Sequence, residues 1–406
     1  DDPISEFASS GGYYFSSARL ALDVFEEMVT RQFTVGGEFY VSLAYKLLVE
    51  RAEAVAVYEL QHFMQWGTPD DLEEYIGWSS VFRRLAFDES RRARQSGLVL
   101  VPMAGLGKRF ADEGYDLPKP MIPVSGRPMV IQATRDLPDA PATRFVLRSD
   151  LPMLNEMLVR LRTSFVGTST LLLDQATEGQ AITCRLGIEN MDMDQPLTIG
   201  ACDNAMLYDV HKLEALLAPG GPDLLIWVVR GHADGRLRPT NFGWVETDAA
   251  GLVTGVRVKQ APENPAVDPM IVGTFTFRRT GDFDLACQAL VDRDGRINNE
   301  YYVDSLIEDA LALGLKCCLF EIDHYLGWGT PNDLKTFEYW QSCFHKWPSH
   351  PYRVDNDRRV PSGSVSHLTA RYAATVPNRP SGVDSTGPST TPKHRHWPWQ
   401  RHWFSK

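Results

Sequence analysis

The chain has few cysteines, and their spacing excludes the usual cysteine-based sites. Six occur among 406 residues, all between Cys184 and Cys343, and no two of them form a C-x-x-C pair. Neither a zinc site nor a disulfide framework is therefore expected. A reducing compartment fits this pattern, and the cytoplasm is the expected location.

Excess positive charge and long apolar runs are also lacking. The formal net charge is −11, which argues against a nucleic-acid partner because such proteins normally carry a basic face. The longest apolar runs, Leu98–Val101 and Leu224–Val229, are too short to cross a bilayer, so no membrane insertion is expected. The sequence starts with neither a signal peptide nor an initiator Met, and we expect a fragment or a processed product.

The most informative feature present is an internal repeat. The phrase W-G-T-P-D-D-L at 66–72 recurs as W-G-T-P-N-D-L at 328–334, and adding 262 aligns 11–82 with 273–344 without a gap. Of these 72 aligned positions, 18 are identical. A match this long at one offset indicates a duplicated domain rather than a solenoid repeat. Only the second copy follows a long segment with a glycine-rich loop, so we expect one complete module and the C-terminal half of another.

The expected domain order follows from this repeat and from composition. It comprises a half-module at 1–85, a polar linker at 86–97, the complete module at 98–354, and a disordered tail rich in Pro, Ser, Thr and His at 355–406.

Periodicity gives the expected elements of the half-module. It predicts helices over 18–31 and 39–51, a strand end at 12–16 and a strand over 54–60, with Thr68 and Pro69 starting a last helix. Strands without their sheet partners would expose apolar edges, so we expect a 97–360 fragment to be more soluble than the whole chain. If the fragment is equally or less soluble, this would indicate that the half-module at 1–85 packs on the complete module.

The complete module alternates apolar runs with helical stretches. It opens with Leu98–Pro102, a run typical of a strand buried on both faces of a parallel sheet. Further strands are expected at 142–147, 170–173, 197–200, 224–229, 243–246, 253–258, 271–277 and 316–320. The pattern predicts an α/β fold with a mostly parallel central sheet and a mixed insertion.

A glycine-rich loop follows the first strand of this module. Glycines in Gly105-Leu106-Gly107-Lys108-Arg109 would let backbone N–H groups face phosphate oxygens. Lys119, in Pro118-Lys119-Pro120, would bring a second cation beside Arg109 to one polyphosphate. A lone G-x-G also occurs in ordinary strand-to-loop turns, so the specific observation is G-x-G-x-R-F combined with P-K-P-x-I-P-V.

At these residues the sequence resembles the sugar-phosphate nucleotidylyltransferases of the NDP-sugar pyrophosphorylase superfamily. The resemblance covers 98–347, and its C-terminal half alone covers 11–82. It implies a Rossmann-like (GT-A-type) core that joins an NTP to a sugar 1-phosphate and releases pyrophosphate, with Mg²⁺, in NDP-sugar biosynthesis. The implied partners are the NTP and the sugar 1-phosphate, and a homo-oligomer stays open.

The resemblance also implies roles for individual positions. Arg109 corresponds to the arginine on the β- and γ-phosphates, Lys119 to the lysine on the α-phosphate and leaving pyrophosphate, and Asp203 to the metal-binding aspartate. The nucleotide-binding positions are Ala104, Gly105, Gly107, Glu178 and Gly179, and the sugar-phosphate-binding positions are Gly243, Lys259 and Glu300.

Physical arguments bear on three of these positions and leave alternatives open. Asp203 follows an apolar run, where a carboxylate faces the ligand crevice of an open sheet, and Mg²⁺ prefers such oxygens. The alternative for Asp203 is a turn or cap aspartate. Lys259 could alternatively be an ordinary surface lysine. Glu300 could alternatively be the first residue of a helix, where the helix dipole stabilises a carboxylate.

One departure from the family concerns a second metal-binding aspartate. Gly327 stands where many relatives have it, and Gln65 stands there in the first copy. The second ligand is therefore missing or supplied by Asp323 or Asp304, which argues against a two-metal mechanism. In the repeated phrase we expect structural roles, with Trp328 packing and Thr330 capping a helix.

Two other functions stay open at this point. The chain could be a catalytically inactive regulatory module that senses nucleotide or sugar, or a nucleotidylyltransferase for a non-sugar phosphate such as phosphocholine or a phosphonate. The residues identify neither the NTP, the sugar nor the pathway.

Overall fold

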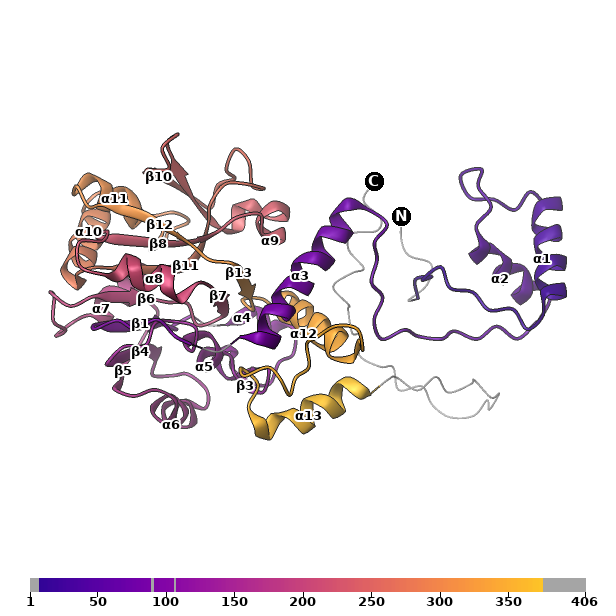
Figure 1. Ribbon diagram of the computed structural model, residues 1–406, viewed down its shortest axis with the longest axis horizontal. Coiled ribbons are helices and arrows are strands. Elements are labelled where there is room, and N and C mark those ends of the chain that lie inside the picture. Colours follow the sequence, from indigo (N-terminus) through magenta and orange to yellow (C-terminus); the bar gives the residue numbers. More distant parts are fainter. Residues whose placement is uncertain (1–6, 89–90, 106, 375–406) are drawn as a thin grey trace. The chain divides into compact units, whose positions relative to one another are not determined.

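The computed structural model describes residues 7–88, 91–105 and 107–374 (Figure 1). Contacts divide the chain into two compact units, residues 72–371 forming one and residues 1–71 with 372–406 the other. The division into half-module, linker, complete module and tail stays a prediction. Within the described ranges, no helix combines the length and apolarity that crossing a membrane requires.

In the smaller unit two helices pack on each other. α1 (Ala18–Thr30) and α2 (Val41–Glu50) confirm the two predicted helices. Ser17 caps α1 by accepting a hydrogen bond from the backbone N–H of Leu20. The shared apolar cluster consists of Val24, Met28, Ala44, Leu47 and Leu48.

The strands predicted at 12–16 and 54–60 are wrong, because both segments lack regular structure. Their equivalents in the second copy, 262 residues later, fall in β11 (Met270–Phe277) and β12 (Cys317–Glu321). Both of those pair with β8 (Leu224–Val229), which precedes the repeat. A strand needs a hydrogen-bonding partner, and the described part of the smaller unit has no counterpart of β8.

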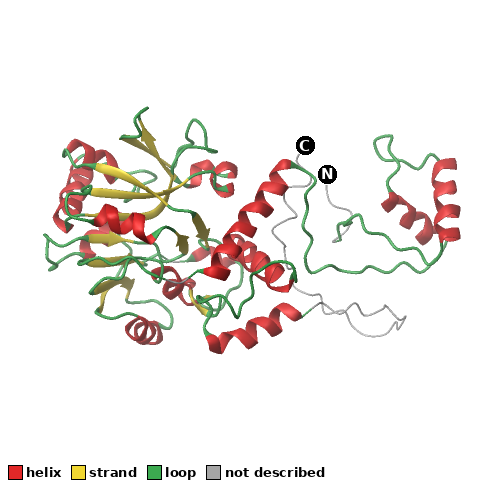
Figure 2. Cartoon of the chain, viewed as in Figure 1, coloured by secondary structure: helices red, strands yellow, loops and turns green. Residues whose placement is uncertain are grey.

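The larger unit is built on a mixed sheet whose central strands are parallel (Figure 2). β1 (Leu98–Pro102) lies between β4 (Ala142–Arg148) and β6 (Leu197–Ile199), parallel to both, and β5 (Thr168–Leu173) extends the β4 side in parallel. On the β6 side, antiparallel β11 is followed by β8 and by β12, which is parallel to β8.

The strands predicted for the complete module are all present. β9 (Gly243–Thr247) and β10 (Val253–Val258) form an antiparallel pair joined to β11, which is the predicted mixed insertion. The sequence did not predict the short strands β2 (Pro123–Val124), β3 (Arg127–Pro128), β7 (Asn204–Leu207) and β13 (His324–Gly327). The fold is therefore α/β with a Rossmann-like, mostly parallel centre, as predicted.

Helices cover both faces of this sheet, as Figure 1 shows. The helices of the larger unit are α3 (Pro69–Phe87), α4 (Lys108–Asp112), α5 (Met129–Thr134), α6 (Leu154–Ser164), α7 (Gln180–Gly187), α8 (Val210–Leu217), α9 (Ala233–Leu237), α10 (Thr280–Asp292), α11 (Leu306–Ala312), α12 (Pro331–Lys346) and α13 (Ser362–Ala373), with 3-10 turns η1 (Lys119–Met121) and η2 (Pro239–Asn241). Of these, α3 has its first three residues in the smaller unit and α13 its last two.

The core has two layers, one on each face of the sheet. Leu98 and Leu100 of β1 point into the layer with α7, α10 and α11, whereas Val99 and Val101 point into the layer with α5, α6 and α8. Alternate residues of a strand face opposite sides, so a strand buried on both faces needs an unbroken apolar run. β1 is such a strand, as the sequence predicted.

The described part of the predicted linker is packed. Ala93 is fully buried, its carbonyl oxygen accepts from the N–H of Asp139, and the Asp139 carbonyl accepts from Gln95. Residues 89 and 90 of the linker lie outside the described residues.

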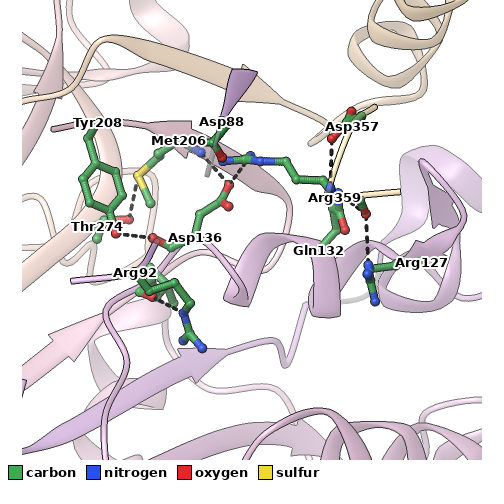
Figure 3. A network of polar contacts seen from close by, with 11 residues as sticks. Asp88, Arg92, Arg127, Gln132, Asp136, Met206, Tyr208, Thr274, Asp357 and Arg359 are labelled. Atoms are coloured by element: carbon green, nitrogen blue, oxygen red, sulfur yellow. Dashed lines mark hydrogen bonds and ion pairs between the residues drawn. The ribbon is translucent and has the colours of Figure 1, made fainter. Parts of the chain in front are cut away.

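The predicted disorder of the tail is wrong over 355–374, while 375–406 lies outside the described residues. Ser362–Ala373 is helix α13, and Arg359 forms an ion pair with buried Asp136 at 2.9 Å. Figure 3 shows this network: Asp136 also accepts from the backbone N–H of Met206 at 2.9 Å, and the Arg359 carbonyl accepts from Arg127. Composition alone misses such contacts, because one buried charge pair can fix a polar segment.

The last helix of the predicted half-module, α3, packs on α12 within the larger unit. Phe82 of α3 is fully buried and contacts Phe344 of α12 at 5.5 Å between ring centroids. A fragment that starts at residue 97 would uncover this face of α12. Uncovering this face would leave the fragment no more soluble than the whole chain, which is the alternative to the predicted gain in solubility.

Replacing Arg359 tests how strongly the Asp136 pair holds the C-terminal segment. We expect Arg359→Met to lower the free energy of unfolding by about 3 kcal/mol, because it leaves a buried carboxylate without its partner. Burial raises the pKa of Asp136 despite Arg359. A carboxyl with a raised folded pKa binds more protons folded than unfolded, so its contribution to stability falls as pH rises. The deficit should therefore be larger at pH 8 than at pH 5 in denaturant titrations.

Arg160→Met is the matched control, because Arg160 pairs with Glu156 on an exposed helix face. Its effect should stay within about 0.5 kcal/mol at both pH values. Equal deficits for the two variants would contradict the assignment.

Candidate active site

The carboxyl ends of β1 and β6 bring the central charges of the site together. The loop with Gly105 and Gly107 follows β1, and Asp203 follows β6, its parallel neighbour. The chain continues from β1 to β4 on one side, whereas β6 lies on the other, so this edge is the topological switch point where such sheets bind ligands. Here the Lys119 Nζ atom lies 2.5 Å from Oδ2 of Asp203.

Gly107 is fixed in place by this arrangement. Its φ of +61° lies in the left-handed region that favours glycine, and a Cβ atom there would lie 2.9 Å from the Lys119 Cβ. Gly105 is exposed with open space around it, and Ala104 is half-buried. The loop thus packs onto Lys119 at Gly107 and is open at Gly105.

The electrostatics keep Lys119 charged. Burial, the largest single influence, lowers the pKa of Lys119, but the Asp203 carboxylate and Cys202 act in the opposite direction and the pKa is raised. Arg109, exposed on α4, carries a like charge that lowers the pKa of Lys119. Burial raises the pKa of the adjacent Cys202 thiol to about 12, so that thiol is neutral at physiological pH. The site therefore presents two cations and one carboxylate.

The repeated Trp-Gly-Thr-Pro phrase lies against Asp203. The backbone N–H of Trp328 donates to the Asp203 carbonyl at 2.8 Å, and a Cβ on Gly329 would lie 3.2 Å from Asp203 Oδ2. Trp328 is buried, and Thr330 caps α12 in a capping box with Asp333, which confirms both predicted structural roles. Sequence reasoning missed that this phrase also closes one side of the Asp203 site.

The alternatives for a second metal ligand do not lie beside Asp203. Gly327 pairs with Asn204 in the β7–β13 ladder, whereas Asp323 precedes the far end of β13. Four residues of strand separate Asp323 from Gly327, roughly 13 Å. Asp304 lies against Gly243 instead. Over the residues that the structure describes, no group of three or more His, Cys, Asp or Glu could hold a metal ion.

The three predicted sugar-phosphate positions lie around Tyr302 and Asp304. A Cβ on Gly243 would lie 2.3 Å from Asp304 Oδ2, and Lys259 Nζ lies 5.6 Å from the Tyr302 ring centroid. Glu300 hydrogen-bonds Tyr302. Gly243 and Lys259 meet because Gly243 pairs with Val258 across β9 and β10.

Asp304 carries a perturbed carboxyl group. Burial raises its pKa to about 6, while the nearby Lys259 cation acts in the opposite direction. The sequence offered Asp304 only as a metal ligand. The sequence did contain a signal for a buried carboxyl here, because an acidic residue in the apolar stretch Tyr301–Leu306 is unusual.

Glu300 lies in a tight turn and not at a helix start. Ile297 and Glu300 form a β-bridge around Asn298 and Asn299, whose φ values are +51° and +63°. Asparagine tolerates this left-handed conformation, which a two-residue hairpin turn requires. Helix α11 begins only at Leu306, so the helix-start alternative for Glu300 is wrong.

The segment with the predicted nucleotide-binding residues Glu178 and Gly179 is held against the same region by backbone contacts. Gly179 has a φ of +135°, and a Cβ there would lie 2.4 Å from the Tyr301 backbone nitrogen. The Tyr301 N–H donates to the Glu178 carbonyl at 2.9 Å, and the Glu178 carboxylate pairs with Arg296 at 2.9 Å. The predicted residues thus form two groups, one around Lys119 and Asp203 and the other around Tyr301 to Asp304.

Comparison with known proteins finds curated relatives for about half of this chain. The chain is 27% identical over 222 residues to the bifunctional protein GlmU of Cupriavidus taiwanensis, a match covering 54% of this chain and 45% of GlmU, and it matches GlmU of Cupriavidus necator equally. The chain thus spans about half the length of the curated relatives it matches. Its similarity to GlmU agrees with the resemblance of its motifs to the sugar-phosphate nucleotidylyltransferases. No protein-family model matches.

Two solved structures are similar at low identity. A nucleoside-diphosphate-sugar pyrophosphorylase from Vibrio cholerae RC9 is 20% identical, with a TM-score of 0.48, over 59% of this chain and 98% of that chain. The inositol-1-phosphate CTP transferase from T. maritima is 13% identical, with a TM-score of 0.46, over 61% and 96%.

The raised pKa of Asp304 has a measurable consequence. Its stabilising contribution is present below the ordinary carboxyl pKa and is lost as pH rises through about 6. We therefore expect Asp304→Asn to raise the free energy of unfolding by about 1–2 kcal/mol at pH 7.5 and to change it little at pH 4. Glu263→Gln, at a carboxyl that is 87% exposed, is the control and should leave the pH profile unchanged. A stability loss in Asp304→Asn at pH 7.5 would contradict the assignment.

Proposed function

We propose that this protein is a nucleotidylyltransferase that joins an NTP to a sugar 1-phosphate and releases pyrophosphate. The observation that carries the proposal is the Lys119–Asp203 pair at 2.5 Å, at the sheet's switch point and under a glycine loop. The similarity to GlmU and the resemblance of the motifs support the same reaction class. The activity, its substrates and its cofactor are our inference.

The reaction needs no protein nucleophile, because the sugar phosphate is already ionised. One of its phosphate oxygens attacks the α-phosphorus of the NTP in line, a new P–O bond forms, and the bond from the α-phosphorus to pyrophosphate breaks. The protein must position two anions and neutralise their charge. Lys119 is suited to the α-phosphate and the departing pyrophosphate, and Arg109 to the β- and γ-phosphates. Ala104, Gly105 and Gly107 would hold the nucleotide with backbone N–H groups.

Asp203 would hold Mg²⁺, as a hard oxygen ligand at the strand end. One carboxylate is sufficient when substrate phosphates and water complete the octahedron, so the donor set fits a single ion. The bound ion would supply neutralisation of phosphate charge. No carboxylate occupies position 327, which favours one metal site over two. In the absence of nucleotide, Lys119 satisfies the Asp203 carboxylate.

The second group of residues would bind the acceptor and the base. Lys259 would pair with the phosphate of the sugar, Glu300 would accept a hydrogen bond from a sugar hydroxyl, and Gly243, which is buried against Asp304, would shape this side of the sugar site. Glu178 and Gly179 would contact the base. Tyr301 supports this assignment, because its backbone ties the base segment directly to the turn with Glu300.

Pyrophosphate release by the full chain tests the proposal. We would supply Mg²⁺, each of four NTPs, and a panel of sugar 1-phosphates that also contains phosphocholine. One pairing should release pyrophosphate, and Arg109→Ala and Lys119→Met should each lower kcat/KM by about a hundredfold or more, because a charge-stabilising group is lost. Arg162→Ala, on the exposed side of α6, is the matched control and should retain full activity.

The other outcomes separate the remaining functions. Release with phosphocholine alone would indicate a non-sugar acceptor. Nucleotide binding without turnover across the panel would favour a regulatory module and contradict the proposed activity.

A further inference from the structure

Two helices at equivalent places in the sequence repeat pack on each other. α3 and α12 begin 262 residues apart, at Pro69 and Pro331, and Figure 1 shows them next to each other. Apart from its first three residues, α3 belongs to the same compact unit as α12. The contact is therefore internal to the larger unit.

Aromatic residues meet their own repeat equivalents in this contact. Trp78 stacks on Trp340 with ring centroids 6.5 Å apart and an interplanar angle of 18°. Phe82 meets Phe344 at 5.5 Å. Each number differs by 262, so both pairs consist of one residue and its own counterpart. Phe82 and Phe344 are fully buried.

Four further ring contacts between the two helices form two matched pairs. Tyr75 contacts Trp340 and Trp78 contacts Phe337, both at 6.3 Å; Tyr75 contacts Phe344 at 6.1 Å and Phe82 contacts Phe337 at 5.7 Å. In each pair, exchanging the two copies converts one contact into the other, since Tyr75 corresponds to Phe337. An interface in which contact i–j is matched by contact j–i has the geometry of a two-fold symmetric dimer.

We propose that the aromatic face of α12 is a pairing surface for the α12 helix of a second copy of this chain, and that α3 fills it within the chain. A surface that accepts its own repeat equivalent through reciprocal contacts is self-complementary. Buried Trp and Phe side chains are also the residues that dominate association energies. The inference goes beyond the proposed catalytic function and does not depend on it.

Two contacts favour the internal partner over the second copy. Glu73 of α3 pairs with Arg236 at 2.6 Å, whereas its α12 equivalent is Lys335, which in a second copy would face Arg236 with like charge. Ser79 lies within hydrogen-bonding distance of His350 at 3.3 Å, and its α12 equivalent is Gln341. Linkage within one chain adds a high effective concentration of α3. The α12 face should therefore pair between copies only when α3 is displaced.

Displacing α3 in the full chain tests the proposal. Trp78→Glu/Phe82→Glu places two charges in the aromatic contact, and amide exchange over 72–87 should accelerate at least about a hundredfold. Sedimentation should then reveal a discrete dimer at about 100 µM, a concentration that populates even a weak pair. Ile76→Glu is the matched control, because Ile76 is 54% exposed on the same helix, and it should stay monomeric like the unaltered chain.

Adding Trp340→Glu should return the displaced chain to a monomer, because it damages the α12 face itself. Trp78→Glu alone is the milder second variant, should the double change disturb folding, and it should form the same dimer in smaller amount. Monomers for both displaced variants at about 100 µM, or association that survives Trp340→Glu, would overturn the proposal.

Discussion

The ion pair between Lys119 and Asp203 is the interaction on which the candidate site depends. It joins a residue behind the β1 loop to a residue at the end of β6, and it exists because these neighbouring strands are parallel and end at one edge. An ammonium and a carboxylate that are both largely shielded from solvent would each be costly alone, so each offsets the desolvation of the other. Gly107 and Gly329 contact the pair from two sides: a Cβ atom at Gly107 would clash with Lys119, and one at Gly329 would lie tightly against Asp203.

Much of the complete module could be predicted, because its strands are buried on both faces and leave unbroken apolar runs. The errors arose where partners outside the local sequence decide the outcome. Residues 54–60 have the pattern of β12 yet form no strand, since no counterpart of β8 pairs with them in the described residues. The opposite error occurred at 355–374, where a polar composition predicted disorder but Arg359 reaches the buried Asp136. Neither partner is visible in local periodicity.

The sequence identified candidate residues of the site, but it did not show which of them are in contact. The family motifs selected positions that the fold assembles into two groups, although their roles stay proposals. Sequence spacing could not relate Gly243 to Asp304, 61 residues apart, because only the folding of the unit brings them into contact. For the same reason the alternatives for a second metal ligand stayed open until the β7–β13 ladder separated Asp323 from Gly327.

The measurement that tests the central claim most directly is the reverse reaction, NTP formation from pyrophosphate and a panel of NDP-sugars with Mg²⁺. The full chain should form one NTP. Asp203→Asn should reduce its rate by about a hundredfold or more, because the proposed metal ligand and the partner of Lys119 are both lost. Asp323→Asn, which alters the exposed aspartate beyond β13, should leave the rate unchanged. Equal rates for Asp203→Asn and the unaltered chain, or a loss confined to Asp323→Asn, would contradict the account.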